Sequence, residues 1–172
     1  MRDLRPILLV EDNPKDAELT LNALERCQLL NQVTHVRDGV EALEYLRSQG
    51  AYEGLNHGGP VVVLLDLKLP KLNGLEVLAE VRGDPDISRT PIVMLTSSRE
   101  EQDLVRSYEL GVNAFVVKPV DFKEFFDAIQ GLGMFWGITN NPPPHRFGAA
   151  GQPSSGPPTA GSSTPGKGRR ND

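Results

Sequence analysis

Four short apolar runs in this sequence each lead into a residue that phosphoryl chemistry can use. Runs rich in Val, Ile and Leu, without polar alternation, are typical of parallel strands that are covered on both faces. The carboxyl ends of such strands share one edge of the sheet, where open α/β sheets bind their ligands. We therefore predict a parallel sheet with its polar strand ends gathered at one edge. The runs are Ile7 to Val10 before Glu11 and Asp12, Val61 to Leu65 before Asp66, Pro91 to Leu95 before Thr96, and Ala114 to Val117 before Lys118.

Helices are expected between these strands, because the intervening segments carry N-terminal capping patterns. Asn13 followed by Pro14 is typical of an N-cap with proline at the first helical position. A further helix is expected from Gly74 to Arg82, before a Gly-Asp-Pro turn. Three more pairs have the three-residue spacing of a capping box, namely Asp38 with Glu41, Ser98 with Glu101, and Asp121 with Glu124.

With residues 33–36 as an additional strand, the chain alternates strand and helix five times. Crossovers between parallel strands are right-handed, and we expect the first and third strands to be neighbours. The predicted fold is an α/β, doubly wound, five-stranded parallel sheet with the flavodoxin-like strand order 2-1-3-4-5. This order brings the loops after the first, third, fourth and fifth strands to one crevice.

Composition allows one domain of this kind. The chain has 172 residues, of which 38% are hydrophobic, and this is enough for one core of ordinary size. From residue 137 onward the sequence is dominated by Pro, Gly and Ser, with little that can pack. We therefore expect a domain at residues 1–136 and a disordered tail at residues 137–172.

Charge and cysteine content narrow the class of protein. The net charge is −5, and the tail holds four basic residues against one acid, so the acidic excess lies in the domain. An acidic domain is a poor nucleic-acid binder, and no second helical pattern follows Trp136 that could enter a DNA groove. Cys27 is the single cysteine, and no apolar stretch is long enough to cross a bilayer. We expect a cytoplasmic protein without nucleic-acid or membrane partners.

The polar strand ends suggest a metal site and a nucleophile. Glu11, Asp12 and Asp66 are expected to meet, and their mutual repulsion calls for a cation such as Mg²⁺, which prefers oxygen ligands. Asp66 follows the most apolar strand, and an ionised carboxylate can attack phosphorus without a base. The Lys118 ammonium and the Thr96 hydroxyl are then placed to contact the phosphoryl oxygens.

Taken in order, the motifs at the strand ends resemble those of two-component response-regulator receiver domains. The resemblance extends from residue 6 to about residue 136. Each motif is weak by itself, but their order and their positions at strand ends make the set specific. The motifs are Glu11-Asp12, Leu65-Asp66-Leu67-Lys68-Leu69-Pro70 followed by Gly74, Leu95-Thr96-Ser97-Ser98, and Phe115-Val116-Val117-Lys118-Pro119.

The resemblance implies that Asp66 accepts a phosphoryl group from a histidine kinase. It implies a Mg²⁺ site formed by Glu11, Asp12, Asp66 and the backbone carbonyl of Lys68. It also implies a signalling protein rather than an enzyme, with at most self-phosphorylation from small donors and self-dephosphorylation.

Further roles follow from the same resemblance. Lys118 and Thr96 would bind the phosphoryl group, and Phe115 would be the switch aromatic that rotates inward as Thr96 moves. Lys68 and Ser98 would form the rim of the crevice where an attacking water enters. A cis peptide bond is implied before Pro119, as in the family.

A narrower resemblance is to the small regulators that partner phytochrome-type histidine kinases, which consist of a receiver alone. It implies a homodimer through the face of the fourth helix, fifth strand and fifth helix. The last helix has a broad apolar face that suits either such an interface or simple packing on the sheet. The features that carry the resemblance are the insertion from Gly50 to Pro60, Leu69-Pro70-Lys71 after the acceptor, Ser107-Tyr108-Glu109-Leu110, and Phe135-Trp136.

Other interpretations of these residues stay open. Glu11 and Asp12 can serve only the start of the first helix, Lys118 can pair with a surface acid, and Phe115 can be plain packing. A phosphatase of the haloacid-dehalogenase type is disfavoured, because Lys68 stands where such enzymes place their general acid. A receiver-like adaptor that works without phosphate is the remaining alternative.

Overall fold

The computed structural model describes residues 4–55, 58–97 and 101–131. The chain divides into two compact units, residues 1–141 and 142–172, and all described residues belong to the first. The predicted domain end at residue 136, the tail at 137–172 and Ser98 lie outside the described residues. The elements are β1 (Ile7–Val10), α1 (Pro14–Arg26), β2 (Val33–Val36), α2 (Gly39–Arg47), the 3-10 helix η1 (Gly50–Tyr52), β3 (Val62–Asp66), α3 (Gly74–Gly83), β4 (Ile92–Thr96), α4 (Glu101–Glu109), β5 (Ala114–Val117) and α5 (Phe122–Gly131).

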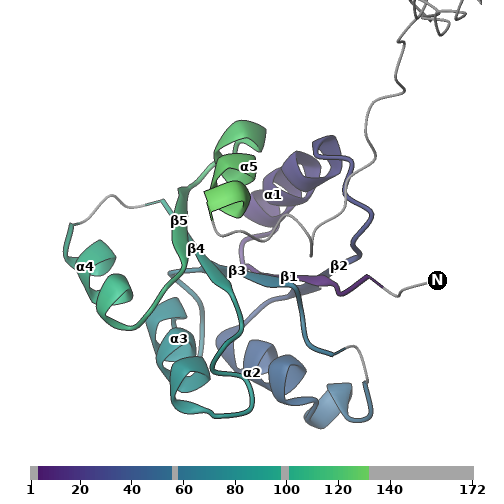
Figure 1. Cartoon of the computed structure of the whole chain (residues 1–172), viewed down its shortest axis with the longest axis vertical. Coiled ribbons are helices and arrows are strands. Elements are labelled where there is room, and N and C mark those ends of the chain that lie inside the picture. Colours follow the sequence, from purple (N-terminus) through teal and green to yellow (C-terminus); the bar gives the residue numbers. More distant parts are fainter. Residues whose placement is uncertain (1–3, 56–57, 98–100, 132–172) are drawn as a thin grey trace, which may run out of the picture. The chain divides into compact units, whose positions relative to one another are not determined.

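The five strands form one parallel sheet in the order β2-β1-β3-β4-β5, as predicted. Helices α1 and α5 lie on one face, and α2, α3 and α4 lie on the other (Figure 1). In the register, Val10 is opposite Leu65 and Thr96 is opposite Val117. The carboxyl ends of β1, β3, β4 and β5 therefore lie at one edge of the sheet.

Alternation along the strands divides the core between the two faces. Leu8 and Val10 pack with residues of α2 and α3, whereas Ile7 and Leu9 pack with residues of α1 and α5. All four residues of β1 are fully buried. Burying a side chain of this size contributes about 1.5–3 kcal/mol, so the central strands hold the sheet edge rigidly in place.

The helix starts agree with the capping patterns wherever the structure describes them. The side chains of Asn13 and Asp38 accept backbone N–H groups at the starts of α1 and α2, and Asp121 does so before α5. The start of α3 at Gly74 is as predicted, but its cap was not: Asn73 and Glu76 form a reciprocal capping box.

The insertion between α2 and β3 is tied to the body of the domain. It contains η1, which the sequence did not predict. The Tyr52 hydroxyl donates a 2.7 Å hydrogen bond to Glu41 Oε1, and the Tyr52 ring packs edge-on against Tyr45. Arg5 donates hydrogen bonds to the carbonyl groups of Gly59 and Pro60. These contacts anchor both ends of the insertion.

The described part of α5 covers the sheet. Phe125 is buried in the core and Phe126 is half-buried. The other aromatic positions of the predicted apolar face, including Phe135 and Trp136, lie outside the residues or side chains described. Among the described residues, no helix has the length and apolar character needed to span a membrane.

Candidate functional site

Five predicted site residues meet at the carboxyl edge of the sheet. Glu11 and Asp12 follow β1, Asp66 and Thr96 end β3 and β4, and Lys118 follows β5. Carboxylate oxygens of the first three lie within 4.8 Å of one another. Glu11 and Asp66 are buried and Asp12 is exposed, so the cluster is a small acidic site that is open on the side of Asp12.

Glu11 lies at the bottom of this site and has no exposed surface. Its Oε1 accepts a 3.0 Å hydrogen bond from the Asn13 backbone N–H, and its Oε2 accepts one of 2.9 Å from Lys118 Nζ. Burial raises the pKa of Glu11 to about 7, although the bonds from Lys118 and Asn13 oppose that rise. The nearby Asp66 carboxylate adds a smaller rise of its own.

Lys118 is the cation of the site. Its Nζ lies 2.8 Å from Asp16 Oδ2, 2.9 Å from Glu11 Oε2 and 3.3 Å from Asp66 Oδ2, and only 9% of its side chain is exposed. Desolvation lowers the pKa of this ammonium, but the bonds to Asp16 and Glu11 and the Asp66 charge outweigh it and raise the pKa. Lys118 therefore stays charged.

The backbone fixes the base of the Lys118 side chain. The Lys118 N–H donates a 2.8 Å hydrogen bond to the Thr96 carbonyl, which joins the ends of β4 and β5. The peptide bond between Lys118 and Pro119 is cis, as predicted from the resemblance. The ammonium thus extends from a defined backbone position into the acidic cluster.

Asp66 is held at the end of the buried strand β3. Its Oδ1 accepts a 3.4 Å hydrogen bond from the backbone N–H of Lys68, and its Oδ2 faces Lys118. A Cβ atom at Gly74 would collide with the Asp66 carbonyl oxygen, so the start of α3 can approach Asp66 only with glycine there. Asp66 itself is only 4% exposed.

The predicted rim is described in part. Lys68 is exposed two residues beyond Asp66, and it lines an open depression of about 460 Å³ together with Leu67, Leu69, Asn73 and Leu75. Its backbone N–H donates to Asp66 Oδ1, so this loop lies against Asp66. Ser98, the other predicted rim residue, lies outside the described residues.

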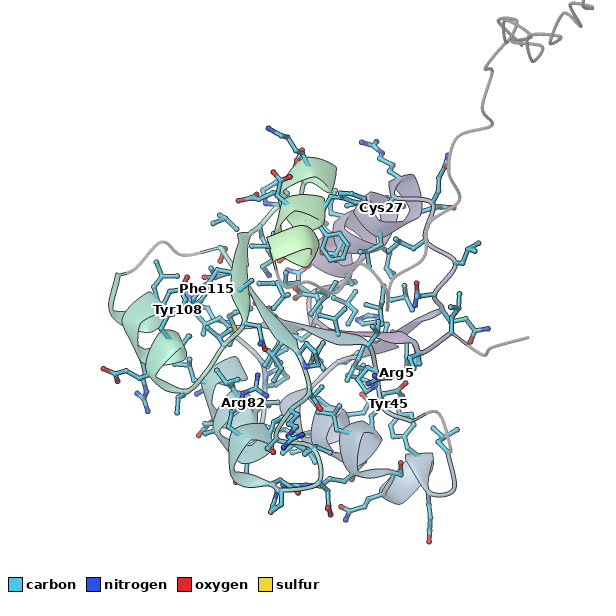
Figure 2. All side chains as sticks on the ribbon, in the orientation of Figure 1. Arg5, Cys27, Tyr45, Arg82, Tyr108 and Phe115 are labelled. Carbon is cyan, nitrogen blue, oxygen red and sulfur yellow. The ribbon has the colours of Figure 1, made fainter. Side chains whose placement is uncertain are left out.

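Thr96 and Phe115 lie on the neighbouring strands β4 and β5, and β4 is paired with the strand that ends in Asp66. Thr96 is buried at the end of β4. Phe115 is half-buried on β5, and its ring packs edge-on against Tyr108 of α4 with centroids 4.9 Å apart. Figure 2 shows the two rings side by side between α4 and β5. Tyr108 is largely exposed, so this pair joins β5 to the exposed side of α4.

Asp16 is a member of the site that the sequence analysis did not single out. It lies in the first turn of α1, where an acid is favoured by the helix dipole, and that local explanation masks its contact with Lys118. The one feature that could have indicated this contact was the position of Asp16 in the first turn of α1. Helix α1 starts at the same sheet edge, so its first turn lies beside the loop after β5. Lys118 therefore pairs with a partly exposed acid as well as with the two buried ones.

The donor set fits a hard divalent cation. Three carboxylates offer oxygen ligands within 4.8 Å of one another, and burial of Glu11, with a smaller contribution from the Asp66 charge, raises the pKa of Glu11. Oxygen ligands with one open side suit Mg²⁺, which keeps part of its water shell. The side chains present are therefore compatible with the predicted cofactor.

Comparison with known proteins identifies the family. The family model described as "Response regulator receiver domain" matches residues 7–130. This chain belongs to the response-regulator receiver family. The receiver is 43% identical to the response regulator Rcp1 of Synechocystis over 130 residues, which cover 76% of this chain and 87% of that protein.

Solved structures extend the comparison. The receiver is 67% identical to the bacteriophytochrome response regulator AtBRR, with a TM-score of 0.74, covering 80% of this chain and 99% of that one. It is 42% identical to the Mn²⁺-bound form of response regulator Rcp1, with a TM-score of 0.64, covering 81% of this chain and 99% of that one. Phytochrome response regulators are thus close homologues of this receiver.

Proposed function

We propose that this receiver is a response regulator that accepts a phosphoryl group on Asp66 from a histidine kinase in a Mg²⁺-dependent reaction. One observation carries the proposal: Asp66 is buried at the end of β3 with Lys118 Nζ 3.3 Å from its Oδ2 and two further carboxylates beside it. A nucleophile, a fixed cation and a set of metal ligands are the parts that phosphoryl transfer to a carboxylate needs.

In the proposed step, an Asp66 carboxylate oxygen forms a bond to the phosphorus of the donor. The bond from phosphorus to the donor nitrogen or oxygen breaks, and its electron pair leaves on the kinase imidazole, which takes up a proton from solvent, or on the acetate released from acetyl phosphate. No base is needed, since a carboxylate nucleophile has no proton to lose. The Lys118 ammonium donates to one phosphoryl oxygen, and the Thr96 hydroxyl donates to another.

Glu11, Asp12, Asp66 and the backbone carbonyl of Lys68 would hold Mg²⁺. When bound, the ion neutralises charge on the carboxylates and on the phosphoryl oxygens. The Mn²⁺-bound structure of Rcp1 supports divalent-metal binding by a homologue of this receiver. Asp12 contributes the exposed carboxylate, so it marks the side from which donor and ion enter.

The proposed activity is signalling rather than turnover of an outside substrate. The residue two positions after Asp66 is Lys68, which cannot act as the general acid of a phosphatase that uses an aspartyl-phosphate. Chemistry at Asp66 would then be limited to self-phosphorylation from small donors and to hydrolysis of its own acyl phosphate.

The proposed partner is a phytochrome-type histidine kinase. The support is the 67% identity to AtBRR, a bacteriophytochrome response regulator. The proposed output surface is α4, β5 and α5, through which two copies would pair. The support within this structure is that the Phe115 ring on β5 packs against Tyr108, which is exposed on α4. Nucleic acid is not a proposed partner.

Intact mass after exposure to acetyl phosphate tests the acceptor chemistry. The wild type should gain the mass of one phosphoryl group with Mg²⁺ and none with EDTA, because the acidic cluster needs the cation. Asp66→Asn should gain none under either condition. Equal labelling of the wild type and the variant would contradict the assignment.

The kinase partner is tested separately. A purified phytochrome-type kinase that carries labelled phosphohistidine should transfer the label to the receiver faster than an unrelated histidine kinase at the same concentration. Equal rates from the two kinases would reject the phytochrome partner and leave the acceptor chemistry intact.

A further inference from the structure

The Lys118 ammonium contacts an acid that the proposed metal site does not use. Asp16 Oδ2 lies 2.8 Å from Lys118 Nζ, the shortest of the three contacts of this ammonium. The three acids whose oxygens gather within 4.8 Å of one another are Glu11, Asp12 and Asp66. Asp16 comes from α1 on the solvent side, with 36% of its side chain exposed. Its contact therefore needs an explanation of its own.

The Lys118 ammonium has as many carboxylate neighbours as it has N–H groups. A lysine ammonium has three N–H groups, and the described structure places three carboxylates around Lys118 Nζ. The contacts to Asp16 and Glu11 are short, at 2.8 and 2.9 Å, whereas the contact to Asp66 is 3.3 Å. Two carboxylates thus hold the ammonium, and the third is the proposed acceptor.

This arrangement allows Asp66 to be phosphorylated without breaking a short bond of the ammonium. When an Asp66 oxygen forms the acyl phosphate, negative charge moves from its carboxylate to the phosphoryl oxygens. The N–H group that faces Asp66 can then turn to a phosphoryl oxygen, while Asp16 and Glu11 keep the other two. Glu11 is also a proposed metal ligand, so Asp16 is the one of these two acids that is not shared with the metal.

We propose that Asp16 is a positioning residue, which holds the Lys118 ammonium beside Asp66 without itself contacting the phosphoryl group or the metal. The inference rests on the proposed function of Asp66. A lysine side chain has a flexible four-carbon stem, and fixing it in advance removes an ordering cost from the transfer step. The bond between α1 and the loop after β5 provides that fixation.

Two substitutions separate positioning from charge repulsion. Asp16→Asn keeps an oxygen acceptor for the ammonium and removes one negative charge, whereas Asp16→Ala removes both. At saturating acetyl phosphate and Mg²⁺, Asp16→Ala should label roughly tenfold more slowly than the wild type, because its lysine is no longer fixed. Asp16→Asn should label at least as fast as the wild type. Glu18→Gln, which neutralises an exposed acid on the same helix, is the matched control and should not change the rate.

Other roles for Asp16 predict a different order of labelling rates among the wild type and the two variants. If Asp16 only repels the incoming phosphoryl group or competes for Lys118, both variants label faster than the wild type. If Asp16 only stabilises the start of α1, both label at the wild-type rate. Either order overturns the proposal. Thermal unfolding of each variant checks that it is folded. If Asp16→Ala is not, Asp16→Leu, which also lacks an oxygen acceptor but fills a similar volume, takes its place with the same expected result.

A second readout needs no phosphoryl donor. In lysine labelled with ¹⁵N, an ammonium held by carboxylates exchanges its protons slowly and gives an NMR signal. The Lys118 signal should be present in the wild type and in Asp16→Asn, and its exchange with water should become several-fold faster in Asp16→Ala. An unchanged exchange rate in Asp16→Ala overturns the proposal. If the wild type shows this pattern but is never labelled on Asp66, the proposed function fails while the role of Asp16 in holding Lys118 stands.

Discussion

Lys118 Nζ lies 2.9 Å from Glu11 Oε2, and the Glu11 side chain has no exposed surface at all. The pair links β1 to the loop after β5, which are far apart in the sequence and are separated in the sheet by β3 and β4. A buried carboxylate depends on its partner for charge compensation. We therefore expect Lys118, the cation of the candidate site, to stabilise the fold as well.

Lys118→Ala should lower the free energy of unfolding, because Glu11 and Asp66 would be left buried without their cation. Removing one partner of a buried polar pair costs about 1–3 kcal/mol, and Mg²⁺ should restore part of this loss by binding the folded carboxylates. Urea unfolding at pH 8, with EDTA or with Mg²⁺, measures both effects. Lys15→Ala, which removes an exposed lysine from α1, is the control. Wild-type stability of Lys118→Ala in EDTA would show that the cation is not needed for the fold.

Asp12→Ala should abolish Mg²⁺-dependent labelling while the fold remains intact. Asp12 is the exposed member of the acidic cluster, so its removal takes away a ligand and also relieves repulsion between carboxylates. Intact mass after acetyl phosphate treatment, together with circular dichroism, checks both parts of the prediction. If Asp12→Ala unfolds instead, the residue serves the start of α1 and not the metal.

Phe115→Ala should weaken the change in contacts that phosphorylation produces, while labelling of Asp66 persists. The Phe115 ring packs on the exposed ring of Tyr108, and an added charge near Thr96 and Lys118 changes a surface only through an element with two arrangements. Sedimentation velocity and kinase binding, with and without a phosphoryl donor, measure the change. A full response of Phe115→Ala in both assays would show that this ring is packing and that the signal leaves by another route.

Lys68→Ala should alter the decay of the phosphorylated receiver more than its formation. The Lys68 side chain is exposed directly beyond the acceptor, while its backbone N–H contacts Asp66 and remains after the substitution. Loss of the labelled mass with time, after removal of the donor, gives the decay rate. Lys68→Asn is a second variant that keeps a polar side chain. Unchanged decay in both variants would remove Lys68 from the rim of the site.

The sheet was predictable because its strands are short apolar runs that need no knowledge of distant residues. Strands β1, β2 and β5 match the predicted ranges, and β3 and β4 begin and end one residue later than predicted, so that they include Asp66 and Thr96. The sheet edge followed from topology, and it brought the predicted carboxylates and Lys118 together.

Two kinds of structural feature could not be predicted from the sequence. Some depend on contacts between distant segments, and others involve a residue whose local role already explains its presence. Asp16 fits the start of any helix, and nothing local shows that this turn of α1 faces Lys118. The packing of Tyr108 on Phe115 depends on how α4 lies against β5. Helix η1 lies inside the insertion, and its Tyr52 bonds to Glu41 on the preceding helix α2, which no local pattern indicates.

The most direct test of the account is to locate the phosphoryl group on the chain. Borohydride reduces an aspartyl phosphate to homoserine, so the receiver can be labelled with acetyl phosphate and Mg²⁺, reduced, digested and sequenced by mass spectrometry. The account predicts homoserine at position 66 and unmodified aspartate at positions 12 and 16. Homoserine at either of those positions, or a labelled protein with unmodified Asp66, would contradict it.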